Sequence, residues 1–165
     1  MKVYLNLGSN LGNRLGNINK AIAQFYNEES IVKNSLKVSD VIESEPWGFQ
    51  SDNAFLNVGI AFETIIDNNN DFDNILSLCQ RIEKLINGTN DHRNNDGNYI
   101  DRILDIDIIA IDECVVNDPP RLILPHPKMH ERHFVLEPMC QLNPQWVHPL
   151  LGISVEEMKK KLDVN

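Results

Sequence analysis

Two carboxylates stand two residues apart in an otherwise apolar segment, Asp105-Ile106-Asp107. In an extended strand the side chains at positions i and i+2 point to the same face, so both acids should lie side by side. Two like charges among isoleucines are costly to bury unless a cation or a basic side chain compensates them, and oxygen ligands suit a hard ion such as magnesium. The spacing favours a metal site, and a structural pair of strand-end acids is the alternative.

Basic residues follow two patterns near these acids. Arg102 precedes the pair by three residues, where a planar guanidinium could either clamp a phosphate or form a salt bridge. The stretch 121–134 concentrates basic groups in a chain whose formal net charge is −9, so it is a candidate polyphosphate site, with a solvated basic helix start as the alternative. Its histidines, His126, His130 and His133, make a poor zinc site, because prolines flank His126 and oppose a helix there.

The segment 43–57 joins flat apolar surfaces to an amide. It contains Trp47, Phe49 and Phe55, followed by Asn57, and such a mixture can stack on a heterocycle and hydrogen-bond its edge. Core packing explains any one of these aromatics equally well. The turn at 8–12 lacks the Gly-Lys-Ser/Thr sequence of a P-loop, so we interpret it as a tight turn.

Length and composition set the frame for these sites. The 165 residues predict one domain spanning 1–165. The acidic balance opposes nucleic-acid binding, and no apolar run is long enough to cross a bilayer. The N-terminus is typical of a first strand rather than a signal peptide, so we expect a cytoplasmic protein, and we assume a monomer.

The hydrophobic periodicity predicts a βαββαβ order with an additional helix. Strands are expected at 3–7, 31–42, 54–64, 100–111 and 122–124, and helices from Asn17, as N-cap, to about Asn27, at 72–87 and at 129–141. The strand at 100–111 is apolar on both faces, which predicts a central position in the sheet. The polar stretch 89–98 predicts a mobile loop. This order indicates an α+β, ferredoxin-like sandwich, with helices on one face of a mainly antiparallel sheet.

Six blocks, in order between about Tyr4 and Leu142, resemble the 6-hydroxymethyl-7,8-dihydropterin pyrophosphokinase family. They lie at 7–12, 45–48, 55–58, 80–83, 101–107 and 124–134. The combination of Asp101-Arg102-Ile103-Leu104-Asp105-Ile106-Asp107 with Leu124-Pro125-His126-Pro127 carries most of the specificity.

The resemblance implies a folate-synthesis enzyme that moves diphosphate from ATP to the hydroxymethyl group of the pterin and releases AMP. Asp105 and Asp107 would hold two Mg²⁺ ions on the ATP phosphates, and Arg102 and Arg93 would join them in catalysis. Residues in the positions that contact ATP in the family are Gln80, Glu83, Arg102, Ile108, Arg121, His126, Pro127 and Arg132. Those in pterin-contacting positions are Ser44, Glu45, Trp47, Phe55, Asn57, Tyr99 and Phe134.

The chain departs from the family pattern in the loop after the second helix. That loop commonly carries several arginines and a tryptophan, whereas here only Arg93 and Tyr99 can stand in for them. The missing charges predict weaker ATP binding or slower turnover than is usual in the family. Two rivals remain: a ferredoxin-like binding module that catalyses nothing, and a metal-dependent phosphohydrolase that uses the same acids.

Overall fold

The computed structural model describes residues 1–46, 51–65, 71–88 and 101–165. Its main sheet is antiparallel throughout, with β1 (Lys2–Ser9) between β4 (Phe55–Glu63) and β5 (Asp105–Ile111). The short strands β2 (Lys37–Val38) and β3 (Ile42–Ser44) both pair with the outer edge of β4. In the described ranges, no helix combines the length and the hydropathy that a membrane crossing requires.

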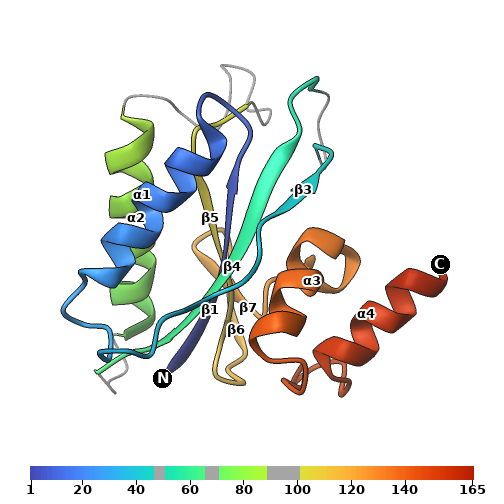
Figure 1. The fold of residues 1–165 in the computed structure, drawn as a ribbon. Coiled ribbons are helices and arrows are strands. Elements are labelled where there is room, and N and C mark those ends of the chain that lie inside the picture. Colours follow the sequence, from blue (N-terminus) through green and yellow to red (C-terminus); the bar gives the residue numbers. More distant parts are fainter. Residues whose placement is uncertain (47–50, 66–70, 89–100) are drawn as a thin grey trace.

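Helices cover both faces of this sheet (Figure 1). One layer consists of α1 (Arg14–Tyr26) and α2 (Asp71–Asn87), and the other of α3 (His133–Leu142) and α4 (Val155–Val164). The predicted α+β sandwich is therefore confirmed, but the expectation of helices on one face is wrong. Successive residues of a strand point to opposite faces, and the central strands have apolar residues on both faces. Both faces of the sheet must therefore be buried by helices.

The strand β5 lies at the end of the described sheet, and its predicted central position is wrong. Its apolar residues fill two cores instead, Ile106 and Ile108 under α1 and α2, and Ile109 and Ala110 under α3. The pairing with β1 shifts register between Tyr4 and Leu5, so one extra residue of β5 is accommodated there. Such a bulge lets consecutive residues turn to the same face.

The helix predicted over 72–87 is confirmed as α2, and Gly88 follows it with a φ of +64°, the left-handed conformation of a C-cap. The predicted N-cap of α1 is wrong. Asn13 caps the helix by accepting a hydrogen bond from the Gly16 amide, while Asn17 is buried and donates to the Leu11 carbonyl at 3.0 Å.

The single strand expected at 31–42 is mostly wrong: it contains an isolated bridge at Ile31 and the short β2, and β3 begins only at its last residue. Between β2 and β3, the Ser39 hydroxyl accepts a hydrogen bond from the Gly59 amide at 2.8 Å, and the Ser39 amide donates to the Gly59 carbonyl at 2.9 Å. The Ser39 hydroxyl thus replaces a backbone carbonyl as the acceptor of one inter-strand hydrogen bond. The regular backbone pairing with β4 is interrupted at this residue.

The C-terminal part differs from expectation in three ways. The helix predicted at 129–141 divides into a 3₁₀ turn, η1 (Met129–Glu131), and α3, because Arg132 between them is extended. The strand β7 (Leu122–Leu124) is confirmed, but it forms a separate hairpin with β6 (Val116–Asp118), which was not predicted. The helix α4 was missed as well, although its capping box, Ser154 with Glu157, is visible in the sequence.

Candidate active site

One row of residues crosses the α3-facing side of the sheet near its end. In register, Asn57 of β4 lies beside Gly8 of β1, and Gly8 lies beside Asp105 of β5. A Cβ on Gly8 would lie 3.3 Å from Asn57 Oδ1 and from a ring carbon of Phe55. The glycine therefore leaves open the space between an amide and a carboxylate that are two strand spacings, roughly 10 Å, apart.

The next row on the same face brings in the second acid. Gly59 of β4 lies beside Asn6 of β1, which lies beside Asp107 of β5. Because Asp105 and Asp107 are two residues apart in a regular part of the strand, both carboxylates share this face, as predicted. Asn6 is buried and its side chain donates to the Phe134 carbonyl at 2.8 Å, so it fixes the start of α3 above the acids.

Among the described residues, both acids form an ion pair with an arginine, and each of these two arginines lies over an aromatic ring. In the first unit, which we call the loop-held pair, Arg102 lies 3.3 Å from Asp105 and 5.6 Å from the ring centre of Phe55. In the second, the helix-held pair, Arg132 lies 3.8 Å from Asp107 and 5.5 Å from the ring centre of Phe134.

Both pairs are largely shielded from water. The arginine side chains are 12% and 15% exposed and the carboxylates 23% and 30%. Partial burial strengthens the attraction between these charges relative to water and also strengthens their attraction for a third charged group. The two predicted roles of Arg102 were a salt bridge and a phosphate contact. The structure shows the salt bridge to Asp105, and this geometry is compatible with a phosphate contact as well.

The amide of Asn57 is held by the neighbouring strand. Its Nδ2 donates to the Ser44 hydroxyl at 2.7 Å, and the residue is buried next to Phe55. This leaves the amide oxygen beside Gly8, towards the open space in the first row. Glu45 follows β3 and is exposed, and it lies farther out along the same edge.

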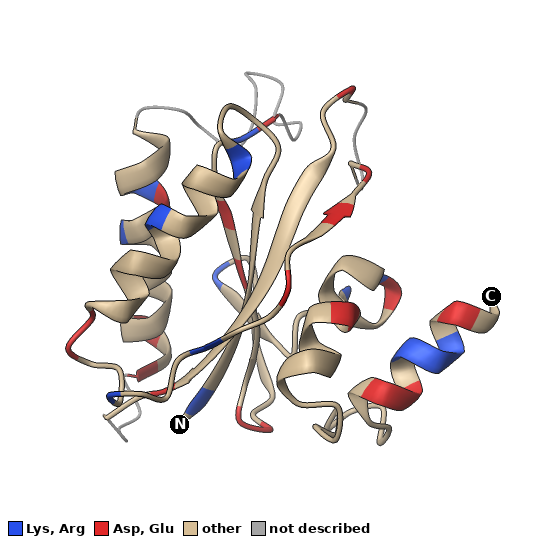
Figure 2. Cartoon of the chain, in the orientation of Figure 1, with Lys and Arg blue, Asp and Glu red and all other residues tan. Residues whose placement is uncertain are grey.

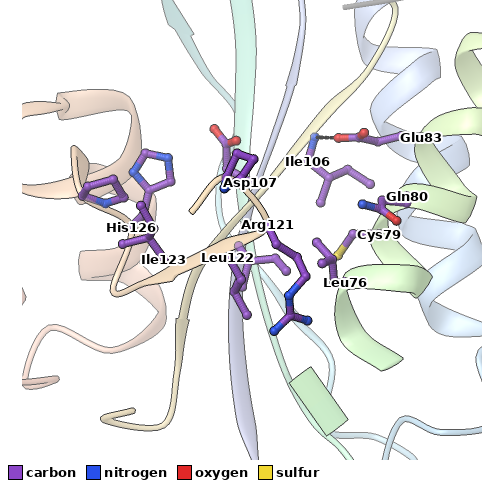
Figure 3. A pocket seen from close by; sticks show the side chains of 13 residues that line it. Leu76, Cys79, Gln80, Glu83, Ile106, Asp107, Arg121, Leu122, Ile123 and His126 are labelled. Carbon is purple, nitrogen blue, oxygen red and sulfur yellow. Dashed lines mark hydrogen bonds between the residues drawn. The ribbon is translucent and has the colours of Figure 1, made fainter. Parts of the chain in front are cut away.

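A cleft of about 320 Å³ opens at the β5 edge of the sheet (Figure 3). Side chains of α2 form one wall and the segment around β7 forms the other, with Asp107 at the β5 end. Of the residues predicted to contact ATP, those lining this cleft are Gln80, Glu83, Ile108, Arg121, His126 and Pro127. The two remaining residues of that set, Arg102 and Arg132, form the arginine pairs described above.

A hydrogen bond from the strand β5 holds the α2 wall of the cleft, and a buried thiol lines it. Glu83 Oε1 accepts a hydrogen bond from the Ile106 amide at 2.6 Å, which ties α2 to the strand that carries both acids (Figure 3). Burial raises the pKa of the Cys79 thiol, so Cys79 contributes a neutral, apolar surface to the cleft.

His126 is neutral at physiological pH. Burial, together with the nearby positive charge of Arg132, lowers the pKa of His126 to about 4. Its Nδ1 accepts a hydrogen bond from the Lys128 amide at 3.1 Å, so the proton resides on Nε2. The ring therefore presents one N–H donor that can face an anion in the cleft.

Arg121 stands at the outer end of the cleft and is held by acids. It forms ion pairs with Asp73 of α2 and with Asp118, the latter at 2.6 Å. These groups are about half exposed, so the pairs orient the guanidinium but add little to stability. Figure 2 shows acidic and basic residues on both helical layers. Arg102 and Arg132 lie at the two acids, and Arg121 lines the cleft.

The structure places the predicted residues at two adjoining positions. Of the pterin set, Ser44, Phe55 and Asn57 lie at the first row and Phe134 lies at the second, beside Arg132. Six residues of the ATP set line the cleft, and Arg102 and Arg132 lie at the two acids. Predictions for Trp47, Arg93, Tyr99 and the loop 89–98 fall outside the described residues. Sequence reasoning missed Asn6, Asn10 and Gly59, because an asparagine or glycine in a strand or turn carries no distinctive signal by itself.

The donor set suits a hard divalent ion that also binds a substrate. Two carboxylates share one face of β5, and no group of three or more His, Cys, Asp or Glu side chains suited to a metal occurs among the described residues. Magnesium is typically held by one or two carboxylates together with substrate phosphates, so two protein oxygens are sufficient only when an anionic ligand completes the shell.

Comparisons with known proteins identify the family of this chain. Residues 4–144 match the family described as 7,8-dihydro-6-hydroxymethylpterin-pyrophosphokinase (HPPK). The 2-amino-4-hydroxy-6-hydroxymethyldihydropteridine pyrophosphokinase of Porphyromonas gingivalis is 37% identical over 89% of this chain and 93% of its own length. The enzyme of the same name from Bacillus subtilis is 32% identical over 84% of this chain and 76% of its own.

Longer proteins also contain a matching part. This chain is 33% identical to the folic acid synthesis protein fol1 of Pneumocystis carinii, covering 97% of this chain but 20% of that protein. The fold matches a solved HPPK-DHPS in complex with substrates, with a TM-score of 0.66 and 10% identity over 97% of this chain and 43% of that one. A Plasmodium falciparum HPPK-DHPS with pteroate gives a TM-score of 0.66 at 12% identity, with 42% of that chain covered. The chain therefore belongs to the 7,8-dihydro-6-hydroxymethylpterin-pyrophosphokinase family.

Proposed function

We propose that this protein transfers diphosphate from ATP to the hydroxymethyl group of 6-hydroxymethyl-7,8-dihydropterin and releases AMP. The observation that carries the proposal is the row of Asn57, Gly8 and Asp105, which sets an amide and the first of the two acids on one sheet face. The separation of roughly 10 Å suits a bicyclic ring whose exocyclic hydroxyl must reach a polyphosphate at the acids. Family membership supports the same reaction.

The acceptor would bind with its ring between Phe55 and Phe134, and Asn57 would hydrogen-bond its edge. Both rings already stack on an arginine of the acid face, so a ring placed there lies next to the reacting phosphates. Ser44 would orient the Asn57 amide through their 2.7 Å hydrogen bond. Glu45, Trp47 and Tyr99 belong to the same proposal as outer contacts of the pterin.

The nucleotide would occupy the cleft at the β5 edge. Gln80, Glu83 and Ile108 would surround the nucleoside, while His126, through its Nε2–H, and Arg121 would contact the phosphates. Arg102 and Arg132 would hold the phosphates near the acids, because a guanidinium can bind an anion bidentately while it stays stacked on an aromatic ring.

Asp105 and Asp107 would hold Mg²⁺, with two ions expected. Such an ion, held by these two carboxylates, would supply positive charge against the charge that develops during transfer. The arginines supply further positive charge at the same position. Arg93 would add to that charge from the loop at 89–98.

The reaction is an in-line displacement. The hydroxymethyl oxygen of the pterin forms a bond to the β-phosphorus, the bond between that phosphorus and the bridging oxygen of the α-phosphate breaks, and AMP leaves with the bond electrons. The hydroxyl proton passes to solvent. The protein forms no covalent bond with the substrates, so orientation by the two aromatic rings and the arginines is its main contribution.

Product analysis tests the proposal. The protein is mixed with ATP, Mg²⁺ and 6-hydroxymethyl-7,8-dihydropterin, with Asp105→Asn and Asp107→Asn as controls that preserve shape. AMP and pterin diphosphate should form with the native protein and not with either control. Phosphate or diphosphate released without the pterin would indicate a phosphohydrolase, and intact ATP with folded protein would indicate a binding module.

A further inference from the structure

Three segments of the chain meet at the carboxylate of Asp101. Its Oδ1 accepts hydrogen bonds from Asn10 Nδ2 at 2.7 Å and from the Ser51 hydroxyl at 2.5 Å. Its Oδ2 accepts from Asn53 Nδ2 at 2.5 Å. One acid therefore joins the turn after β1, the segment that leads into β4 and the segment that leads into β5.

Asn10 reinforces this junction from the buried side, where it is 2% exposed. Its Oδ1 accepts from the Arg102 amide at 2.8 Å, and its own amide donates to the Arg102 carbonyl at 3.2 Å. Its Nδ2 also donates to the Asn53 carbonyl at 3.3 Å. The main chain of Arg102 is thus bonded on both sides to the same residue that contacts Asp101.

The two segments gathered by Asp101 lead directly to proposed site residues. On one side, Arg14 donates to the Ala54 carbonyl at 2.9 Å, and the next residue is Phe55. On the other side, Arg102 follows Asp101 and stacks over Phe55. Asp101 is therefore connected, through these two segments, to both members of the contact between Phe55 and Arg102. In the proposed function, Phe55 binds the pterin and Arg102 binds the phosphates.

We propose that Asp101 is a positioning residue for diphosphate transfer: it holds the segment 51–54 against Arg102 so that Phe55 and the loop-held pair keep one relative placement. The inference rests on the proposed function and extends it to a residue that contacts neither substrate. Hydrogen bonds to an ionised acceptor are roughly twice as strong as neutral ones, so a single carboxylate can hold a segment that has little apolar surface to bury.

The junction has an ionic character that a titration would reveal. Burial alone would raise the pKa of Asp101, but the hydrogen bonds from Ser51, Asn53 and Asn10 hold the pKa below its ordinary value. The carboxylate is therefore an acceptor at both oxygens at neutral pH. An amide in its place would offer one acceptor and one donor.

This asymmetry allows a rescue experiment. Asp101→Asn would turn an amide N–H₂ towards the N–H₂ of Asn53, so two donors would meet. Asn53→Asp alone would place two carboxylates together. In the double variant the amide at 101 again has an acceptor opposite it, and one negative charge is retained. Asp52→Asn is the matched control, because Asp52 is exposed in the same segment and its substitution changes the net charge equally.

Steady-state kinetics on the full chain measures the effect. We expect Asp101→Asn to lower kcat/KM for the pterin about tenfold or more, which corresponds to one lost hydrogen bond to a charged group, while the affinity for a non-hydrolysable ATP analogue is unchanged. The double variant should recover most of the loss, and Asp52→Asn should match the native protein. Native kinetics in Asp101→Asn, or a loss that the double variant does not restore, would overturn the proposal.

Two further readouts distinguish a positioning role of Asp101 from a purely stabilising one and from failure of the reaction itself. If Asp101 only stabilised the fold, its substitution would lower the melting temperature but leave kcat and KM of the folded protein unchanged, which would also overturn the proposal. If the native protein formed no pterin diphosphate, the proposed function would fail instead. Hydrogen exchange of the amides at 51–54 would then still report on the junction, and exchange that is equal in native protein and Asp101→Asn would refute the contact itself.

Discussion

The loop-held pair and the helix-held pair have nearly the same arginine-to-ring distance but are supported in different ways. Their arginines differ by 0.1 Å in distance to the aromatic ring, 5.6 Å against 5.5 Å, and both arginines are mostly buried. Arg102 depends on polar groups, namely Asn10 and Asp101. Arg132 immediately precedes α3, and its carbonyl accepts from the amides of the first turn at 3.0 Å.

The helix-held pair is anchored by the second hydrophobic core. Leu136 of α3 and Met129 of η1 are fully buried, and a Cβ on Gly59 beneath the helix would lie 2.8 Å from Pro138 Cβ. Close packing of this kind resists displacement because any shift creates a void or a clash. Two arginines of one site are therefore positioned in two different ways. Hydrogen bonds between polar groups hold Arg102, and a helix packed on the hydrophobic core holds Arg132.

Removing the charge of either acid should have the largest effect. Asp105→Asn and Asp107→Asn should each lower kcat by about a hundredfold to a thousandfold, because each removes a negatively charged oxygen ligand of the proposed Mg²⁺, whose positive charge would stabilise the phosphates. Quenched-flow or coupled AMP assays measure this, with circular dichroism as the folding control. A large loss of kcat in only one of the two variants would show that the two pairs do not contribute equally to catalysis.

Exchanging each arginine for lysine should follow. Arg102→Lys and Arg132→Lys should each lower kcat/KM by about tenfold to a hundredfold, because lysine keeps the charge but loses the planar, bidentate and stacked contact. The ratio between the two losses sharpens the comparison, and similar losses are expected because the two arginine-to-ring distances are 5.6 Å and 5.5 Å. Full activity in either variant would show that its arginine contributes charge alone.

The packing beneath α3 gives the next prediction. Gly59→Ala should lower the free energy of unfolding by about 1–3 kcal/mol, because the added Cβ meets Pro138 and the helix must move. It should also raise KM for the pterin through Phe134. Urea denaturation measures the first effect. If Gly59→Ala were as stable as the native protein, α3 would be able to move away from the added Cβ at little cost in free energy.

Acid should affect the helix-held side first. The pKa of His126 in the folded protein is about 4, against an ordinary value of 6.5, so between these values the unfolded chain binds more protons. Stability should therefore fall as the pH falls from 6.5 to 4. His126→Asn, which retains an acceptor for the Lys128 amide, should flatten this part of the curve. An unchanged slope in the variant would exclude His126 as its source.

The loop-held side should respond only in stronger acid, with the smallest effect. The pKa of Asp101 in the folded protein lies below its ordinary value of 3.8, so its contribution to stability is complete above that pH and is lost as the pH falls through the lower, folded value. Comparing acid unfolding of native protein and Asp101→Asn isolates this contribution. If the native protein and Asp101→Asn were equally stable at pH 5, where the Asp101 contribution should be complete, the predicted direction of the pH dependence would be wrong.

Part of this site could be predicted because it depends on local periodicity. The helix α2 and the strand β4 follow from apolar spacing, and the shared face of Asp105 and Asp107 follows from the two-residue repeat of a strand. The motifs around these acids and His126 were specific enough to indicate the family. Breaks such as the one at Ser39 were not predictable, because a side chain of one strand replaces a ladder bond of another.

What the sequence determined by itself was therefore the chemistry of the site: an acid pair on one strand face, arginines near it, and a family pattern. Only the tertiary structure decided which residues face one another. The row of Asn57, Gly8 and Asp105 unites segments about fifty residues apart, and strand register depends on packing across the whole sheet. The partners of Arg102, Arg132 and Asp101 are equally non-local, so no spacing along the chain could identify them.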